Sequence, residues 1–103
     1  MQPFRTLDLA VDFVRAARNV ALPTHLRDQF ARASSSVALN LAEGSAKSSP
    51  RDRARFYEIA LGSLRESQVI LRLVVDDCAP IARQADMLAA HVFKLVRGTR
   101  ATC

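Results

Sequence analysis

The sequence contains few of the residues that form tight turns. It has 3 Gly and 4 Pro in a chain of 103 residues. It also has 1 Tyr and no Trp, two aromatic residues that favour strands. An all-β domain needs many turns, so this composition argues against one. Ala, Leu and Arg are instead abundant, and all three favour helix. A chain of this length is expected to form a single domain over residues 1–103 that buries one modest core.

Cysteines and long apolar runs are also scarce. Cys78 and Cys103 lack the spacing of metal ligands, which favours free thiols in a reducing compartment. Asp8 and Asp12 interrupt the apolar segment that a secretory leader would need. No apolar run approaches the roughly 20 residues that span a membrane. We therefore expect a soluble, cytoplasmic protein with no membrane partner.

The sequence lacks the motifs that assemble a catalytic or metal site. His25 and His91 have no second histidine four residues away, and a leucine stands three residues before each. The Glu-x-x-His motif of diiron bundles is therefore missing. Neither a phosphate-binding loop nor a zinc-ligand pattern occurs, and no base accompanies the serines at positions 34–36. We predict no catalytic residue, no metal and no cofactor.

Apolar periodicity predicts helices over residues 6–19, 24–43, 50–76 and 80–97. Thr24 is the expected N-cap of the second helix and Gly44 its expected end. Ser49 followed by Pro50 is the clearest start signal in the chain, and Gly98 is expected to end the fourth helix. Four helices with short links indicate an all-α, antiparallel up-down-up-down four-helix bundle.

The helix predicted over residues 50–76 has two apolar stripes on opposite sides. The first stripe contains Phe56, Ile59, Ser63, Glu66, Ile70 and Leu73, and the second contains Tyr57, Leu61, Leu64, Leu71 and Val75. One bundle core covers one stripe, so we predict that the first faces the core. The second stripe, together with Leu39, is then predicted to contact another copy of the chain. The alternative is that this helix is unusually central within its own bundle.

Polar residues and glycine recur within the segments 40–44 and 62–66. A glycine inside a helix costs about 1 kcal/mol relative to alanine, and a carboxylate on a packing face needs a partner. We predict a polar motif that fixes the register of two helices, formed by Gln29, Arg32, Ser36, Asn40, Glu43, Gly44, Ser63 and Glu66. The alternative is a catalytic or ligand-binding role for Glu43 or Glu66.

Positive charge is the third pattern. The net charge is +5, and most of the 15 basic residues are arginine, which suits bidentate contact with phosphate. The predicted nucleic-acid-binding residues are Arg51, Arg55, Arg65, Arg72, Lys94, Arg97 and Arg100. The alternative is a solvated arginine face with local ion pairs.

The segments 26–44, 48–50 and 59–66 together resemble the bacterial four helix bundle family. Its members include proteins encoded by intervening sequences within 23S ribosomal RNA genes. The resemblance covers about residues 7–96. The motif positions it carries over are Gln29, Arg32, Ser36, Asn40, Glu43, Gly44, Phe56, Gly62, Ser63 and Glu66.

The resemblance implies a bundle that assembles into a homopentameric ring and has no catalytic residue. A relative, the accessory variability determinant protein of diversity-generating retroelements, partners a reverse transcriptase and binds RNA and DNA through a basic surface. The leading hypothesis is therefore a non-enzymatic, oligomeric bundle that binds RNA or a ribonucleoprotein. The alternative is a protein-interaction scaffold with an unknown partner and no nucleic-acid binding.

Overall fold

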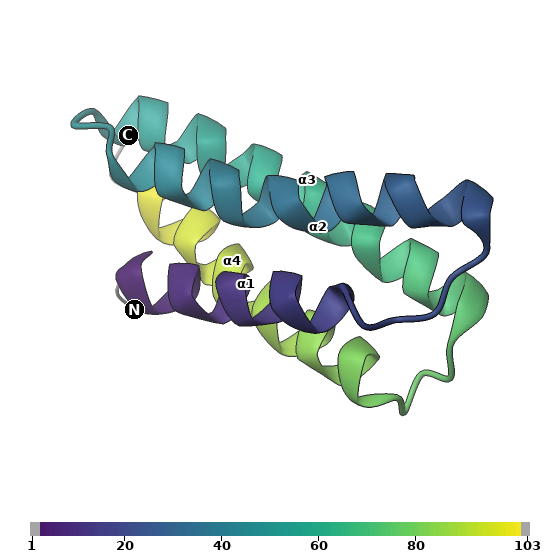
Figure 1. The fold of residues 1–103 in the computed structure, drawn as a ribbon. Helices are drawn as coiled ribbons and strands as arrows, with labels where there is room; N and C mark the ends of the chain where they lie inside the picture. Colours follow the sequence, from purple (N-terminus) through teal and green to yellow (C-terminus); the bar gives the residue numbers. More distant parts are fainter. Residues whose placement is uncertain (1–2, 102–103) are drawn as a thin grey trace.

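The computed structural model describes residues 3–101, which form a four-helix bundle measuring 40 × 23 × 18 Å (Figure 1). Its helices are α1 (Pro3–Ala17), α2 (Thr24–Ser45), α3 (Pro50–Val74) and α4 (Pro80–Ala101). Consecutive helices run in opposite directions (Figure 1). Within the described residues, α1 and α3 each pack against both α2 and α4 but not against one another. The predicted all-α, four-helix class is confirmed.

The helix boundaries differ from the predicted ones at most ends. The helices α1 and α3 end two residues early, whereas α2 continues through Gly44 and α4 continues through Gly98 to Ala101. Thr99, which follows the predicted end of the fourth helix, is helical, and its hydroxyl donates to the carbonyl of Leu95 at 2.8 Å. Cys78 is a free, exposed thiol, while the predicted free thiol at Cys103 lies outside the described residues.

The capping predictions have mixed outcomes. The Ser49 hydroxyl accepts a hydrogen bond from the backbone N–H of Asp52 at 3.2 Å, and Pro50 opens α3 as predicted. The prediction that Thr24 caps α2 is wrong, because Pro23 occupies the N-cap position and no side chain caps this end. The predicted stop at Gly44 is also wrong, since α2 ends at Ser45 and Ala46 follows as its C-cap.

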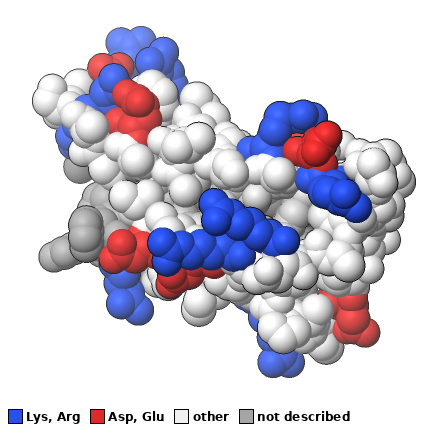
Figure 2. Space-filling model, viewed as in Figure 1, with Lys and Arg blue, Asp and Glu red and all other residues white. Residues whose placement is uncertain are grey.

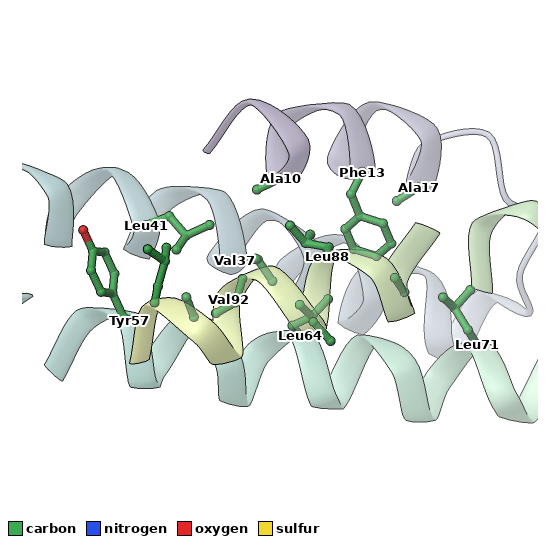
Figure 3. Close-up of a cluster of buried hydrophobic side chains, with 14 of the residues drawn as sticks. Ala10, Phe13, Ala17, Val37, Leu41, Tyr57, Leu64, Leu71, Leu88 and Val92 are labelled. Atoms are coloured by element: carbon green, nitrogen blue, oxygen red, sulfur yellow. The ribbon is translucent and has the colours of Figure 1, made fainter. Parts of the chain in front are cut away.

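The core lies where all four helices meet (Figure 3). The rings of Phe13 on α1 and Phe30 on α2 meet edge to face, with centroids 6.4 Å apart. Val37 and Leu41 on α2 and Val92 on α4 are also buried in this core. The hydroxyl of the buried Ser34 donates to the carbonyl of Phe30 at 2.8 Å, so it enters the core with its hydrogen bond made.

The predicted orientation of α3 is wrong. Tyr57, Leu64 and Leu71, which were assigned to a partner surface, are at most 1% exposed and lie in the chain's own core (Figure 3). Ile59 and Leu73, assigned to the core, are 45% and 68% exposed. Of the stripe predicted to face the core, Ile70 is buried as expected. The alternative of an unusually central helix is not supported either, because α3 packs against two helices as every other helix does, and part of its first stripe stays exposed.

The register of α3 explains this reversal. From position 57 to position 71, one buried stripe advances by alternating steps of three and four, as in a coiled-coil seam, and is formed by Tyr57, Ala60, Leu64, Ser67 and Leu71. Small residues allow α3 to approach its neighbours closely on that side. The Ser67 hydroxyl is satisfied within the helix, donating to the carbonyl of Ser63 at 3.0 Å.

The structure also bears on the membrane prediction. None of the helices within residues 3–101 combines the length and the apolar character that crossing a lipid bilayer requires.

Candidate functional site

The line of contact between α2 and α3, here called the α2–α3 seam, contains most of the predicted polar motif. Near its middle, the hydroxyls of Ser36 and Ser63 lie 2.7 Å apart. The Asn40 amide donates to the Ser36 carbonyl at 2.8 Å and to the Ser36 hydroxyl at 2.9 Å. These part-buried groups satisfy one another, and a slip of one helix along the other would break their contacts.

Gly44 belongs to this seam because of its size. A Cβ atom at position 44 would lie 2.7 Å from Cε1 and 2.9 Å from Cδ1 of Tyr57, and 3.1 Å from Cβ of Phe56. The Tyr57 ring is buried and its hydroxyl lies 3.2 Å from that of Ser45, so the ring has little freedom to move away. The glycine therefore permits the close approach of α2 and α3. It does not supply a left-handed helix cap, since no described glycine has a positive φ.

The carboxylates of the motif lie at the surface. Glu66, predicted on the inner stripe of α3, is exposed, and its Oε2 accepts a hydrogen bond from Nε2 of Gln29 at 3.3 Å. Glu43 forms an exposed ion pair with Lys47 at 3.1 Å, and Arg32 is exposed. The partner of Glu66 within the predicted motif is thus Gln29 of α2. Both glutamates are therefore exposed to solvent rather than enclosed by the bundle.

The opposite side of α3 faces α4 across a series of hollows, here called the α3–α4 groove. One hollow of about 530 Å³ has Arg65 and Arg72 of α3 on one side and Ala82 and Ala85 of α4 on the other. A second, of about 320 Å³, continues from it and is lined by Arg65 and Phe93, among others. The alanines leave this side of the bundle open where bulkier residues would fill it.

Polar side chains connect the two helices across the middle of the groove. Nη1 of Arg65 donates to Oε1 of Gln68 at 3.0 Å, and Nε2 of Gln68 donates to Oδ1 of Asp86 at 2.8 Å. All of these hydrogen bonds are solvent-exposed, so they contribute little to stability. They orient the guanidinium of Arg65 at the edge of the groove.

A third hollow marks the end of the groove where α3 begins and α4 ends. It is lined by Arg51, Arg55 and Arg100, together with Asp52 and Glu58. Arg100 and Glu58 form an ion pair that joins α4 to α3. Three arginines against two acidic residues leave this hollow with a small excess of positive charge.

Most of the predicted basic residues are thus gathered by the tertiary structure. Arg97 extends the set, because its guanidinium lies 5.8 Å from the ring centroid of Phe93. Lys94 is exposed but lines none of the three hollows described above. On the face that α1 and α2 present, basic side chains stand in separate groups, several with an acidic side chain beside them (Figure 2).

The predicted partner surface is divided by the structure. Tyr57, Leu64 and Leu71 are core residues, and Leu61 and Val75 pack partly buried against the core. Leu39 alone of that set is strongly exposed, at 69%. A partner would therefore meet the outer side of α2 and α3, where Leu39 and Ile59 are exposed, rather than the stripe named from the sequence.

Among the described residues, no three His, Cys, Asp or Glu side chains are grouped closely enough to hold a metal ion. The α3–α4 groove instead offers guanidinium groups, one exposed aromatic ring and small apolar surfaces. Sequence reasoning missed Phe93, because the hollow that Phe93 shares with Arg65 forms only where α3 packs against α4.

Comparison with known proteins supplies one match. A family model described as 23S rRNA-intervening sequence protein matches residues 5–98, nearly the whole chain. Neither the curated proteins nor the solved structures contain a significant match. The matched region includes the whole of α2 and α3, most of α1 and α4, the α2–α3 seam and most of the α3–α4 groove.

Proposed function

This chain belongs to the 23S rRNA-intervening sequence protein family, and we propose that it is a non-enzymatic helical bundle that associates with RNA or a ribonucleoprotein. It would act as an accessory protein that holds a nucleic acid against its surface. A nucleic-acid enzyme, such as a reverse transcriptase, is the protein partner that the family resemblance suggests.

The observation that carries the proposal is the row of arginines along the α3–α4 groove. Arg51, Arg55 and Arg100 line one end, and Arg65 and Arg72 line the hollow towards the other. Guanidinium groups bind phosphate oxygens in a bidentate manner, and such contacts carry no base sequence information. The expected mode of binding is electrostatic, with little sequence preference.

The charge of one groove is modest, because acidic residues share it. Asp52 and Glu58 lie at one end, and Asp77 and Asp86 lie at the other. An assembly would place several grooves on one particle and so multiply the positive potential that a polyanion meets. Oligomerisation is therefore the second part of the proposal, with a homopentameric ring as the form that the resemblance implies.

The experiment is a titration of fluorescently labelled RNA, with binding followed by anisotropy across a range of KCl concentrations. Affinity is expected to fall steeply with salt, and Arg65→Gln with Arg72→Gln should weaken binding and reduce the salt slope by about 1 per lost phosphate contact. The control is Arg5→Gln with Arg15→Gln, an equal loss of charge on α1, which does not contact α3. Absent binding at low salt, or equal losses in both variants, would overturn the proposal.

Self-association has its own observation and its own measurement. Leu39 and Ile59 are exposed on α2 and α3, at nearly the same level along the seam that the Ser36–Ser63 contact aligns. Apolar side chains so placed favour a protein partner, most simply another copy. Light scattering should give a mass several times that of one chain, and Leu39→Glu should lower it without unfolding the bundle. A monomeric wild-type protein would remove this part of the proposal.

The same apolar surface supports the second candidate function, a protein-interaction scaffold that binds no nucleic acid. In that case the arginines of the groove are solvated and the outer surface of α2 and α3 binds a different protein. The RNA titration separates the two candidates, because the scaffold predicts no salt-dependent binding.

A further inference from the structure

We propose that the α3–α4 groove is a binding site for single-stranded nucleic acid, in which an unpaired base stacks on Phe93. This inference rests on the proposed function and narrows its ligand to a strand whose bases are free. Arginines alone would contact only the phosphates, and the Phe93 ring adds a contact with a base.

The position of Phe93 is the first observation. It is 43% exposed on the outer side of α4, whereas the aromatic side chains Phe13, Phe30 and Tyr57 are buried in the core. Its ring borders a hollow of about 320 Å³ whose walls include Ala89 and Ala90. Small side chains beside an exposed ring leave room for a flat group to lie against it. Base stacking on an aromatic ring needs such a space and tolerates any base.

The cations around the ring are the second observation. The guanidinium of Arg97 lies 5.8 Å from the Phe93 ring centroid, and Arg65 approaches the same hollow from α3. A base on Phe93 would therefore have arginines of both α3 and α4 near the phosphates that flank it. This combination of a stacking ring and neighbouring cations is typical of single-strand binding surfaces.

The path of the strand is the third observation. The hollow at Phe93 shares Arg65, Gln68 and Asp86 with the larger hollow that reaches Arg72, so the groove continues for a second nucleotide. The carboxylate of Asp86 on α4 repels phosphate and accepts hydrogen bonds from the amino groups of bases. The backbone of the strand is thus expected along α3, beside Arg65 and Arg72, with its bases directed towards α4.

A duplex does not fit this arrangement. Its bases are paired and stacked within the helix, so Phe93 could reach none of them without unpairing. A single strand has unpaired bases, so no free energy of unpairing opposes its binding. The site therefore predicts a preference for unpaired strands that the arginines by themselves would not produce.

The test compares two single-stranded oligonucleotides of equal length, one with ordinary bases and one made abasic along its centre. Both carry the same phosphates, so their difference isolates contacts to bases. Wild-type protein should bind the ordinary strand about tenfold more tightly, and Phe93→Ala should abolish that difference while leaving the abasic affinity unchanged. Phe93→Trp should restore it, because the larger ring also stacks. The control is Met87→Ala, which removes an exposed apolar side chain from the same helix but outside the hollows of the groove.

The outcomes separate this inference from the proposed function. If both strands bind with equal affinity and Phe93→Ala changes neither, the base site is refuted while electrostatic binding stands. If neither strand binds at low salt, the proposed function fails as well. Circular dichroism of each variant verifies the fold, which an exposed residue at position 93 should not disturb.

Discussion

The α2–α3 seam and the α3–α4 groove lie on two sides of the same helix, but different kinds of side chain line them. In the seam, part-buried hydroxyls and an amide satisfy one another, and Gly44 lets a backbone approach a buried tyrosine. In the groove, alanines face exposed arginines, and the connecting hydrogen bonds are open to solvent. The seam has the features of a structural contact, whereas the groove has room and charge for a ligand. The motif rich in polar residues thus belongs to the α2–α3 seam, which is the structural contact.

The largest effect on stability is expected for a core residue of α3, the helix that packs against both α2 and α4. Leu64 is fully buried on α3, between α2 and α4. Leu64→Ala should lower the free energy of unfolding by roughly 2–5 kcal/mol, because it leaves a cavity in the core. Chemical denaturation measures this, with Leu73→Ala as the control at a position that is 68% exposed. Equal, small effects of both changes would contradict the assignment of Leu64 to the core.

Two glycines distinguish the seam from the open outer face of α3. Gly44→Ala should destabilise the protein by about 1–3 kcal/mol, because its methyl group would overlap the buried Tyr57 ring. Gly62→Ala should stabilise it by about 0.5–1 kcal/mol, because nothing beyond its chain neighbours and the local helix backbone lies within 4 Å of the added Cβ, and alanine favours helix. Thermal unfolding of the two variants compares them directly. A stabilising Gly44→Ala would show that the seam is looser than described.

The smallest effects compare one polar contact from each side. Ser63→Ala removes the hydroxyl that contacts Ser36, and it should cost about 1 kcal/mol because the contact is part-buried. Gln68→Ala removes the exposed bridge between Arg65 and Asp86, and it should change stability by less than about 0.5 kcal/mol.

A double-mutant cycle over Ser36→Ala and Ser63→Ala isolates the energy of that one contact. A coupling energy near zero would remove the hydroxyl pair from the features that fix the register of α2 and α3.

The sequence by itself determined the number of helices and several of their ends. Pro50 after Ser49 and Pro80 mark helix starts through their own backbone chemistry, which does not depend on neighbouring helices. The inner surfaces of α2 and α4 also follow from sequence, because each helix has one dominant apolar stripe. Sequence was misleading at three positions. Thr24 does not cap α2, and α2 and α4 continue through Gly44 and Gly98, where each was predicted to end.

Only the tertiary structure decided the orientation of α3 and the place of the candidate site. Both sides of α3 are apolar, and the choice between them depends on how closely the neighbouring helices approach Ala60 and Ser67. The role of Gly44 likewise depends on Tyr57, which lies on the next helix. Phe93 and Arg65, 28 positions apart in the chain (93 minus 65), line one hollow because α3 packs against α4. Distances between helices set these features, and the periodicity of one helix carries no information about them.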